Sequence, residues 1–177
     1  MPGPVFLSGE RVRLHTVEEE DLDAFARARS DPDLRIPLCI DTPQNREGLE
    51  EFFEETISSD DGYWFVVSVD EETVGAVMYP NVRESDGLGE LAYWILPEYQ
   101  SAGYGREAVS LLLEYGFEEL RLNRVQADCV ATNEASSGLL ESLGFTREGQ
   151  FREAVFQNGR HVDVRRYGLL ADEWRDR

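Results

Sequence analysis

Residues 91–108, Leu91-Ala-Tyr-Trp-Ile-Leu-Pro-Glu-Tyr-Gln-Ser-Ala-Gly-Tyr-Gly-Arg-Glu-Ala108, contain the pattern that decides the fold. A strand stops at Pro97, a loop of small residues follows, and a helix opens next to Gly105. Gly103 and Gly105 let the backbone turn and let a ligand approach it closely. The N–H groups of the helix's first turn point outward at the positive end of the helix dipole. The segment therefore predicts an anion site suited to a pyrophosphate, and Arg106 adds a cation there.

Three alternatives compete with this interpretation. Gly103–Ala108 also satisfies the dinucleotide fingerprint G-x-G-x-x-A, but Pro97 and five more residues separate the strand from the first glycine. A P-loop is excluded because the chain has no Lys. The two glycines could also merely turn the chain. The flanking strand, Gln100 at the start of the loop and Arg106 at the start of the helix favour the anion site.

Outward from this segment, hydrophobic periodicity predicts seven strands and four helices. Tyr63–Val69 and Thr73–Tyr79 form a hairpin, and Asn158-Gly159 is a strong hairpin signal between two alternating runs. The fold class is α+β (mixed α/β), with antiparallel hairpins at both ends and a β-α-β crossover in the middle. The other expected strands lie at about 11–15, 88–96, 124–131, 151–156 and 161–169, and the expected helices at about 22–31, 46–57, 104–120 and 133–143.

The chain has 177 residues without a repeat or linker, which predicts a single domain over residues 1–177. Its 36 acidic and 17 basic residues give a formal net charge of -19, and every basic residue is Arg. This charge argues against nucleic acid and against anionic membranes as partners. A surface this acidic is typical of a halophilic protein kept soluble in concentrated salt, and an ordinary acidic cytosolic enzyme is the alternative.

The cysteines and the apolar runs indicate a cytoplasmic protein without structural metal. Cys39 and Cys129 are 90 positions apart and provide neither a disulfide framework nor a zinc motif. The first residues lack the pattern of a signal peptide, and the apolar stretches are too short to span a bilayer. We therefore expect a soluble protein in the cytoplasm that needs no metal.

A set of motifs resembles a known family. Gln100-Ser-Ala-Gly-Tyr-Gly105 matches the Q/R-x-x-G-x-G/A signature of the GCN5-related N-acetyltransferase (GNAT) superfamily, and Asn133–Ser136, Leu143–Phe145 and Arg147–Gly149 follow in the order of that family. The set is similar to the branch of ribosomal-protein amino-terminal acetyltransferases (RimJ/RimL type). The resemblance implies a twisted, mixed and largely antiparallel sheet of about seven strands with about four helices. It also implies that this sheet splays open at the cofactor site, between the strand ending at Leu96 and the strand beginning at Arg124.

The resemblance further implies acetyl-CoA as the co-substrate. Gln100 begins the loop whose backbone N–H groups would hold the pyrophosphate, and backbone groups near Ile95 and Leu96 would pair with the pantetheine arm. Asn133 and Ser136 would line the far side, near the sulfur. The residues expected in the pyrophosphate loop are Ser101, Ala102, Gly103, Tyr104, Gly105 and Arg106.

Acetyl transfer to an amine needs a neutral amine and a proton for the thiolate that leaves. Glu90 is the candidate base, acting through water, because the family often places a carboxylate there; a solvated or salt-bridged strand residue is the alternative. Ser136 is the candidate proton donor to sulfur, with helix capping as its alternative role. Glu153 is the reserve base, and Asp163 and Tyr167 are expected along the acceptor cleft.

The predicted function is an N-acetyltransferase in which an amine attacks acetyl-CoA directly in a ternary complex. The expected acceptor is a protein N-terminal α-amine, whose pKa of about 7.7–8.0 makes deprotonation a modest demand. A small amine or amino acid is the alternative acceptor. A non-catalytic acyl-CoA-binding module and a dinucleotide-binding domain are the other hypotheses. The expected assembly is a monomer or homodimer.

Overall fold

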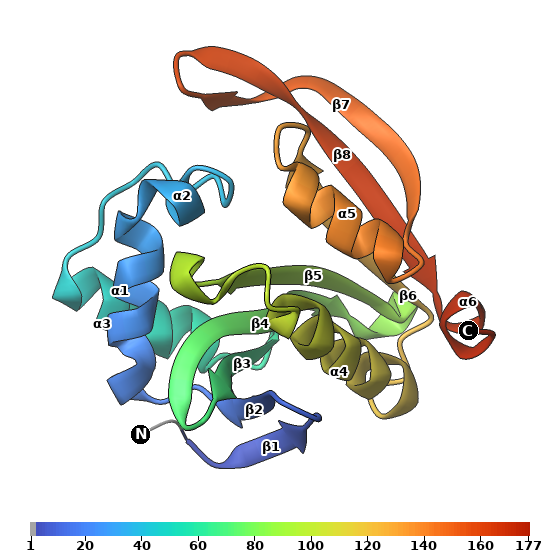
Figure 1. Ribbon diagram of the computed structural model, residues 1–177, viewed down its shortest axis with the longest axis horizontal. Helices are drawn as coiled ribbons and strands as arrows, with labels where there is room; N and C mark the ends of the chain where they lie inside the picture. Colours follow the sequence, from blue (N-terminus) through green and yellow to red (C-terminus); the bar gives the residue numbers. More distant parts are fainter. Residues whose placement is uncertain (1–2) are drawn as a thin grey trace.

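One eight-stranded sheet organises the protein, in the order β1-β2-β3-β4-β5-β6-β8-β7 (Figure 1). The computed structural model describes residues 3–177. Neighbouring strands are antiparallel except β5 and β6, which confirms the mixed, largely antiparallel sheet. The strands are β1 (Val5–Ser8), β2 (Arg13–Thr16), β3 (Tyr63–Val69), β4 (Glu72–Arg83), β5 (Leu88–Ile95), β6 (Arg124–Val130), β7 (Thr146–Gln157) and β8 (Arg160–Leu170).

The expected number of seven strands is one too low, because β1 adds an edge strand. Its four residues lack the alternation that marks a half-buried strand, and they pair with β2 across an irregular register. Phe6 in β1 is 48% exposed yet stacks on Phe65 at 5.4 Å between ring centroids. Packing of the Phe6 side chain therefore fixes β1 at the edge of the sheet, although the local sequence does not predict a strand there.

Helices cover both faces of the sheet. Residues of α1 and α3 pack on one face with Val66 and Trp94, and α4 packs on the other with Leu91 and Val125 (Figure 1). Among the helices that the structure describes, none is long and apolar enough to span a membrane. The helices are α1 (Leu22–Ser30), α2 (Pro32–Arg35), α3 (Arg46–Phe52), α4 (Tyr104–Glu118), α5 (Glu134–Ser142) and α6 (Ala171–Arg175).

Two of these six helices, α2 and α6, were not expected. α2 begins at Pro32, whose fixed φ suits the first helical position, and the Asp31 side chain caps it by accepting the N–H of Asp33. The helix expected over residues 46–57 is α3 followed by one π-helical turn at Phe53–Ile57. α2 and α6 are too short for the spacing of apolar residues to predict them as helices.

The sheet splays open between β5 and β6. The two strands pair in parallel only over Leu88–Glu90 and Arg124–Gln126, and from Leu91 they separate. A bulge in β4 between Met78 and Asn81 lies beside this point. An extra residue bends a strand, and Pro80 has no N–H to donate to the ladder of hydrogen bonds. β4 and β5 therefore bend together away from β6. The splay is therefore associated with the bulge in β4.

Tyr79 in this bulge fixes the position of α4. Its side chain is fully buried, and its hydroxyl donates to the carbonyl of Leu112 at 3.0 Å. A Cβ atom at Gly116 would lie 2.5 Å from the Tyr79 hydroxyl, so only glycine lets α4 lie this close. The bulge that opens the sheet thereby also places the helix that begins at the splay.

Candidate functional site

A cavity of about 890 Å³ occupies the splay. Its walls come from β5 and β6, from the loop before α4, from α5, from the segment after α2 and from the β7–β8 hairpin. Nine of the twelve predicted site residues line it, which are Ile95, Gln100, Ser101, Gly103, Tyr104, Gly105, Arg106, Asn133 and Ser136. Leu96, Ala102 and Glu90 lie outside the lining.

The loop before α4 presents its backbone to the cavity. Ser101 and Gly103 have φ of +64° and +86°, and Gly103 is the N-cap of α4. A Cβ atom at Gly105 would lie 3.3 Å from Ile95 Cγ1, which shows how closely α4 approaches β5. The Gln100 side chain donates from Nε2 to the Ile95 carbonyl at 2.8 Å and fastens the start of the loop. These contacts direct the N–H groups of the first turn of α4 into the cavity.

Arg11 supports the loop from behind, and sequence reasoning did not identify it. Its Nη1 donates to the Ala102 carbonyl at 2.8 Å, and its Nε pairs with Glu107 at 3.0 Å. Glu107 also accepts the backbone N–H groups of Arg11 and Val12. Burial raises the pKa of Glu107, but these N–H groups and the guanidinium outweigh it, and the pKa lies below its ordinary value. A partner 96 positions away leaves no local signal.

The inner edge of β5 is open where it borders the cavity. Leu96 donates its N–H to the Val74 carbonyl at 2.8 Å, so this group faces β4 and cannot pair with a ligand in the splay. Because adjacent residues of a strand direct their N–H groups to opposite edges, the N–H of Ile95 faces the cavity. An open strand edge is suited to a ligand that carries amide groups.

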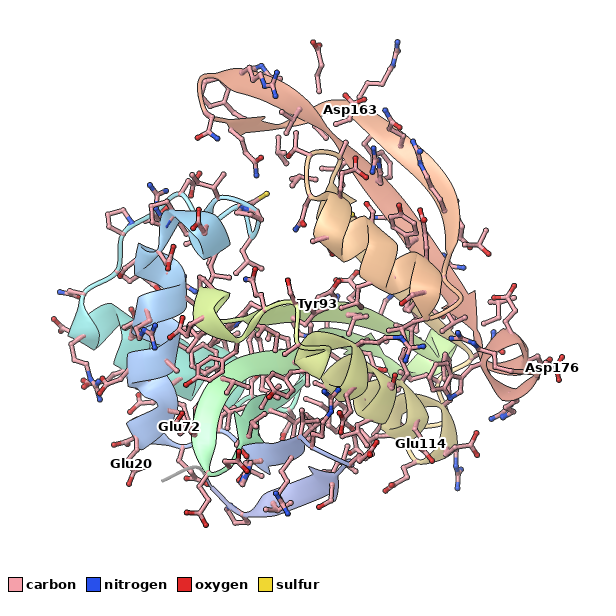
Figure 2. All side chains as sticks on the ribbon, in the orientation of Figure 1. Glu20, Glu72, Tyr93, Glu114, Asp163 and Asp176 are labelled. Carbon is pink, nitrogen blue, oxygen red and sulfur yellow. The ribbon has the colours of Figure 1, made fainter. Side chains whose placement is uncertain are left out.

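Tyr93 lies in the space between β5 and α5 (Figure 2), and its hydroxyl is hydrogen-bonded to Ser136. Asn133 caps α5 by accepting the Ser136 N–H at 3.1 Å, and Ser136 Oγ lies 2.7 Å from Tyr93 Oη. Burial raises the pKa of Tyr93 to about 12, so the phenol keeps its proton at neutral pH. Sequence reasoning missed Tyr93, although its alternation with Leu91 and Ile95 places it on the α5 side of β5.

The candidate bases lie in different surroundings. Glu90 belongs to the last paired position of β5 and β6, where its Oε1 accepts from Gln126 Nε2 at 3.1 Å. It lies where β5 and β6 are still paired, next to the point at which the two strands separate. Glu153 is exposed in an irregular part of β7, and its N–H donates to Asp163 at 2.8 Å. Glu90 therefore lies next to the cavity but outside its lining, and Glu153 faces solvent.

Two residues expected along the acceptor cleft do not line the cavity. Asp163 holds the irregular part of β7 on the outer hairpin, well away from Tyr93 (Figure 2). The Glu153 N–H and the Gln150 side chain keep the pKa of Asp163 below its ordinary value. Tyr167 is fully buried, and its hydroxyl donates to Glu141 at 3.1 Å. The alternation of β8 puts Tyr167 in the core, and no local signal distinguishes it from a cleft residue.

The cavity continues onto the face of the sheet that lies away from α4, and we call this part the far chamber. Its charged side chains are Asp33, Asp128 and Arg166, and Arg166 donates to both carboxylate oxygens of Asp128 at 2.9 and 2.7 Å. Its other lining residues are largely apolar, namely Leu34, Pro37, Leu38, Cys39, Ala92, Trp94, Phe151, Ala154, Val155 and Val164. Within residues 3–177, no group of three or more His, Cys, Asp or Glu side chains could hold a metal ion.

Comparison with known proteins identifies the family. The model of the acetyltransferase (GNAT) domain matches residues 11–146, most of the chain. This chain belongs to the GNAT acetyltransferases. Spermidine N(1)-acetyltransferase of Vibrio cholerae is 29% identical over 94% of this chain and 97% of its own length. YdaF of Bacillus subtilis, provisionally named a ribosomal N-acetyltransferase, is 37% identical over 56% of this chain and 55% of its own.

A solved structure agrees with the fold. Spermidine N-acetyltransferase from Vibrio cholerae, in complex with CoA and spermine, superposes with a TM-score of 0.89 at 24% identity over 94% of this chain and 99% of that one. As a member of the GNAT family, the protein is an acetyl-CoA-dependent N-acetyltransferase. The cavity fits this co-substrate chemically, because it offers N–H donors at a helix start for phosphates and an open strand edge for amides.

Proposed function

We propose that this acetyltransferase transfers the acetyl group to the primary amine of a small molecule, by direct attack in a ternary complex. The observation that carries the proposal is that one cavity joins the loop before α4 to the far chamber. Both substrates can therefore meet in one space. Holding reactants together in this way removes much of the entropic cost of a bimolecular step.

The residues that border the cavity are assigned as follows. The backbone from Ser101 to Arg106 binds the pyrophosphate, and the Ile95 N–H is available to the pantetheine arm or to the thioester oxygen. Acetyl-CoA, when bound, supplies the activated acetyl group. Ser136, held by Tyr93, donates a proton toward the departing sulfur. Glu90, which lies just outside the lining, takes the amine proton through water.

A contact above the far chamber favours a small acceptor. The Gln157 side chain at the end of β7 donates to the Ile36 carbonyl after α2, which links the hairpin to the α2 segment. Because the linked segments both contribute to the lining of the far chamber, this contact holds its two walls together, which favours a small amine over a protein segment. The full-length similarity to a spermidine acetyltransferase also favours a small amine. The protein N-terminus expected from the sequence is the second candidate, and the similarity to YdaF supports it.

Release of free thiol from acetyl-CoA tests the proposal. We would compare small primary amines with a short peptide that has a free N-terminus, and an N-acetylated peptide serves as the matched control. Small amines should raise thiol release at least tenfold above hydrolysis and give higher kcat/KM than the peptide. Exclusive use of the peptide would favour the second candidate. If the enzyme binds acetyl-CoA but no amine raises thiol release, the chain is a binding module.

A further inference from the structure

From the chemistry of the far chamber we infer that the acceptor is a primary amine with a single positive charge on an apolar group, and not a polyamine. This inference rests on the proposed function and specifies its substrate class. It concerns the walls of the far chamber, and it differs from the spermidine for which the Vibrio cholerae relative is named.

The apolar walls of the far chamber come from two sides. Leu34 and Leu38 belong to α2 and the segment after it, and Phe151 and Val155 belong to β7. Phe151 is 45% exposed, so it offers apolar surface to the chamber. An apolar acceptor would cover Phe151 and these neighbours, and burial of one aliphatic or aromatic group changes affinity by about 10- to 100-fold.

The charges at the base of the far chamber compensate one another. Asp128 is held by two hydrogen bonds from Arg166, and the Arg166 guanidinium also lies over the Phe151 ring at 4.9 Å from its centroid. Arg166 therefore occupies the Asp128 carboxylate with which a second ammonium group of the substrate would pair, and its positive charge repels that ammonium group. Asp33 is the remaining carboxylate of the lining, and it is exposed. Glu90, next to the lining, accepts from Gln126 and is the proposed base, so its carboxylate is needed for the proton of the reacting amine.

Deprotonation separates the two substrate classes further. An amine must lose its proton before it attacks, so a monoamine enters the reaction as a neutral group in an apolar chamber. A polyamine keeps its other charges at neutral pH, since amines of this kind have pKa values near that of Lys, about 10.4. Each retained charge would need a carboxylate partner in the chamber, and burying it without one is unfavourable.

The net charge of -19 would obscure this preference at low salt. A polycation is attracted to the whole acidic surface, which raises its encounter rate whatever the chamber prefers. At about 1 M salt the Debye length is roughly 3 Å, so this long-range attraction is screened while contacts within the far chamber persist. Acceptor preference is therefore measured in molar KCl.

The test compares kcat/KM for leucinamide, butylamine and spermidine in the full-length enzyme, with thiol release as the readout. We expect leucinamide to exceed spermidine at least tenfold. Arg166→Gln should shift this ratio about tenfold toward spermidine, because it frees Asp128. Arg160→Gln makes the same change of charge on the same strand, outside the cavity lining, and should leave the ratio unchanged.

The outcomes distinguish the inference from the proposed function. The comparison of amines in the unmodified enzyme needs no variant to fold. Spermidine used as well as leucinamide, or better, would overturn the inference and leave the proposed function standing. An equal shift in Arg166→Gln and Arg160→Gln would also overturn it, since net charge would then set the preference. If no amine accelerates thiol release, both fail together.

Discussion

Gly103→Ala tests the pyrophosphate loop most sharply. Gly103 has a φ of +86°, and in this region an L-residue costs about 1–2 kcal/mol relative to glycine. A lower entropy of the unfolded chain offsets about 0.4–1 kcal/mol of this cost. The added Cβ would lie 3.1 Å from Arg11 Nη2, the end of a flexible side chain that can move. The variant should therefore lose on the order of 1 kcal/mol of stability without ligand, or about 2–4 °C in Tm.

The larger effect should appear on ligand binding. Displacing one backbone donor from a phosphate removes a hydrogen bond to a charged group, worth about 1.5–3 kcal/mol, which raises the Kd for acetyl-CoA about 10- to 100-fold. The assay is thermal unfolding with and without acetyl-CoA. At a ligand concentration of about 100 times the Kd of the unmodified protein, stabilisation is about 2.7 kcal/mol, and a tenfold rise in Kd reduces it to about 1.4 kcal/mol.

Gly138→Ala is the matched control. Gly138 lies in α5, outside the cavity lining, and a Cβ atom there would meet nothing within 4 Å. The same substitution should stabilise the helix by about 0.5–1 kcal/mol and leave the acetyl-CoA effect intact. If Gly103→Ala retains the full stabilisation by acetyl-CoA, this loop does not bind the pyrophosphate.

Four further predictions concern catalysis, pH and salt. Tyr93→Phe removes the hydrogen-bond partner of Ser136, so kcat should fall on the order of tenfold while the KM for acetyl-CoA stays unchanged. An unchanged kcat with a raised KM would contradict a positioning role for Tyr93. Glu90→Gln should slow turnover mainly below the pKa of the acceptor amine, and an unchanged pH–rate profile would remove Glu90 from the mechanism. The pKa of Glu107 is lowered in the folded protein, so its contribution to stability is present above its unfolded pKa of about 4.3 and is lost as the pH falls through the folded value. Glu107→Gln should therefore flatten the acid limb of the unfolding curve, and an unaltered limb would contradict this. Thiol release should persist or rise in molar KCl, because the screened acidic surface then repels acetyl-CoA less, and inhibition by KCl would count against this view.

The central part of the fold could be predicted because its signals are local. The strand before Pro97, the loop at Gln100 and the amphipathic stripe of α4 each follow from a few adjacent residues, and the structure has them as expected. The splay was expected only through family resemblance. Its physical cause, the β4 bulge at Pro80, depends on pairing between strands and could not be read from either strand alone.

The parts of the site that were missed depend on contacts between distant segments. Arg11 reaches Ala102 across 91 positions, and Gln157 reaches Ile36 across 121. The far chamber combines the α2 segment with β7, two of the least periodic regions of the chain. Leu96 was expected near the pantetheine arm only through the family resemblance, but the alternation of hydrogen-bonding edges directs its N–H to Val74.

Initial-rate kinetics with acetyl-CoA and leucinamide both varied, with free thiol and acetylated amine quantified together, test the central claim most directly. Direct attack within one cavity predicts that each thiol released is matched by one acetylated leucinamide and that the double-reciprocal lines intersect. Thiol release that does not depend on the amine, or parallel lines that indicate an acetylated enzyme, would contradict transfer in a ternary complex at the splay between β5 and β6.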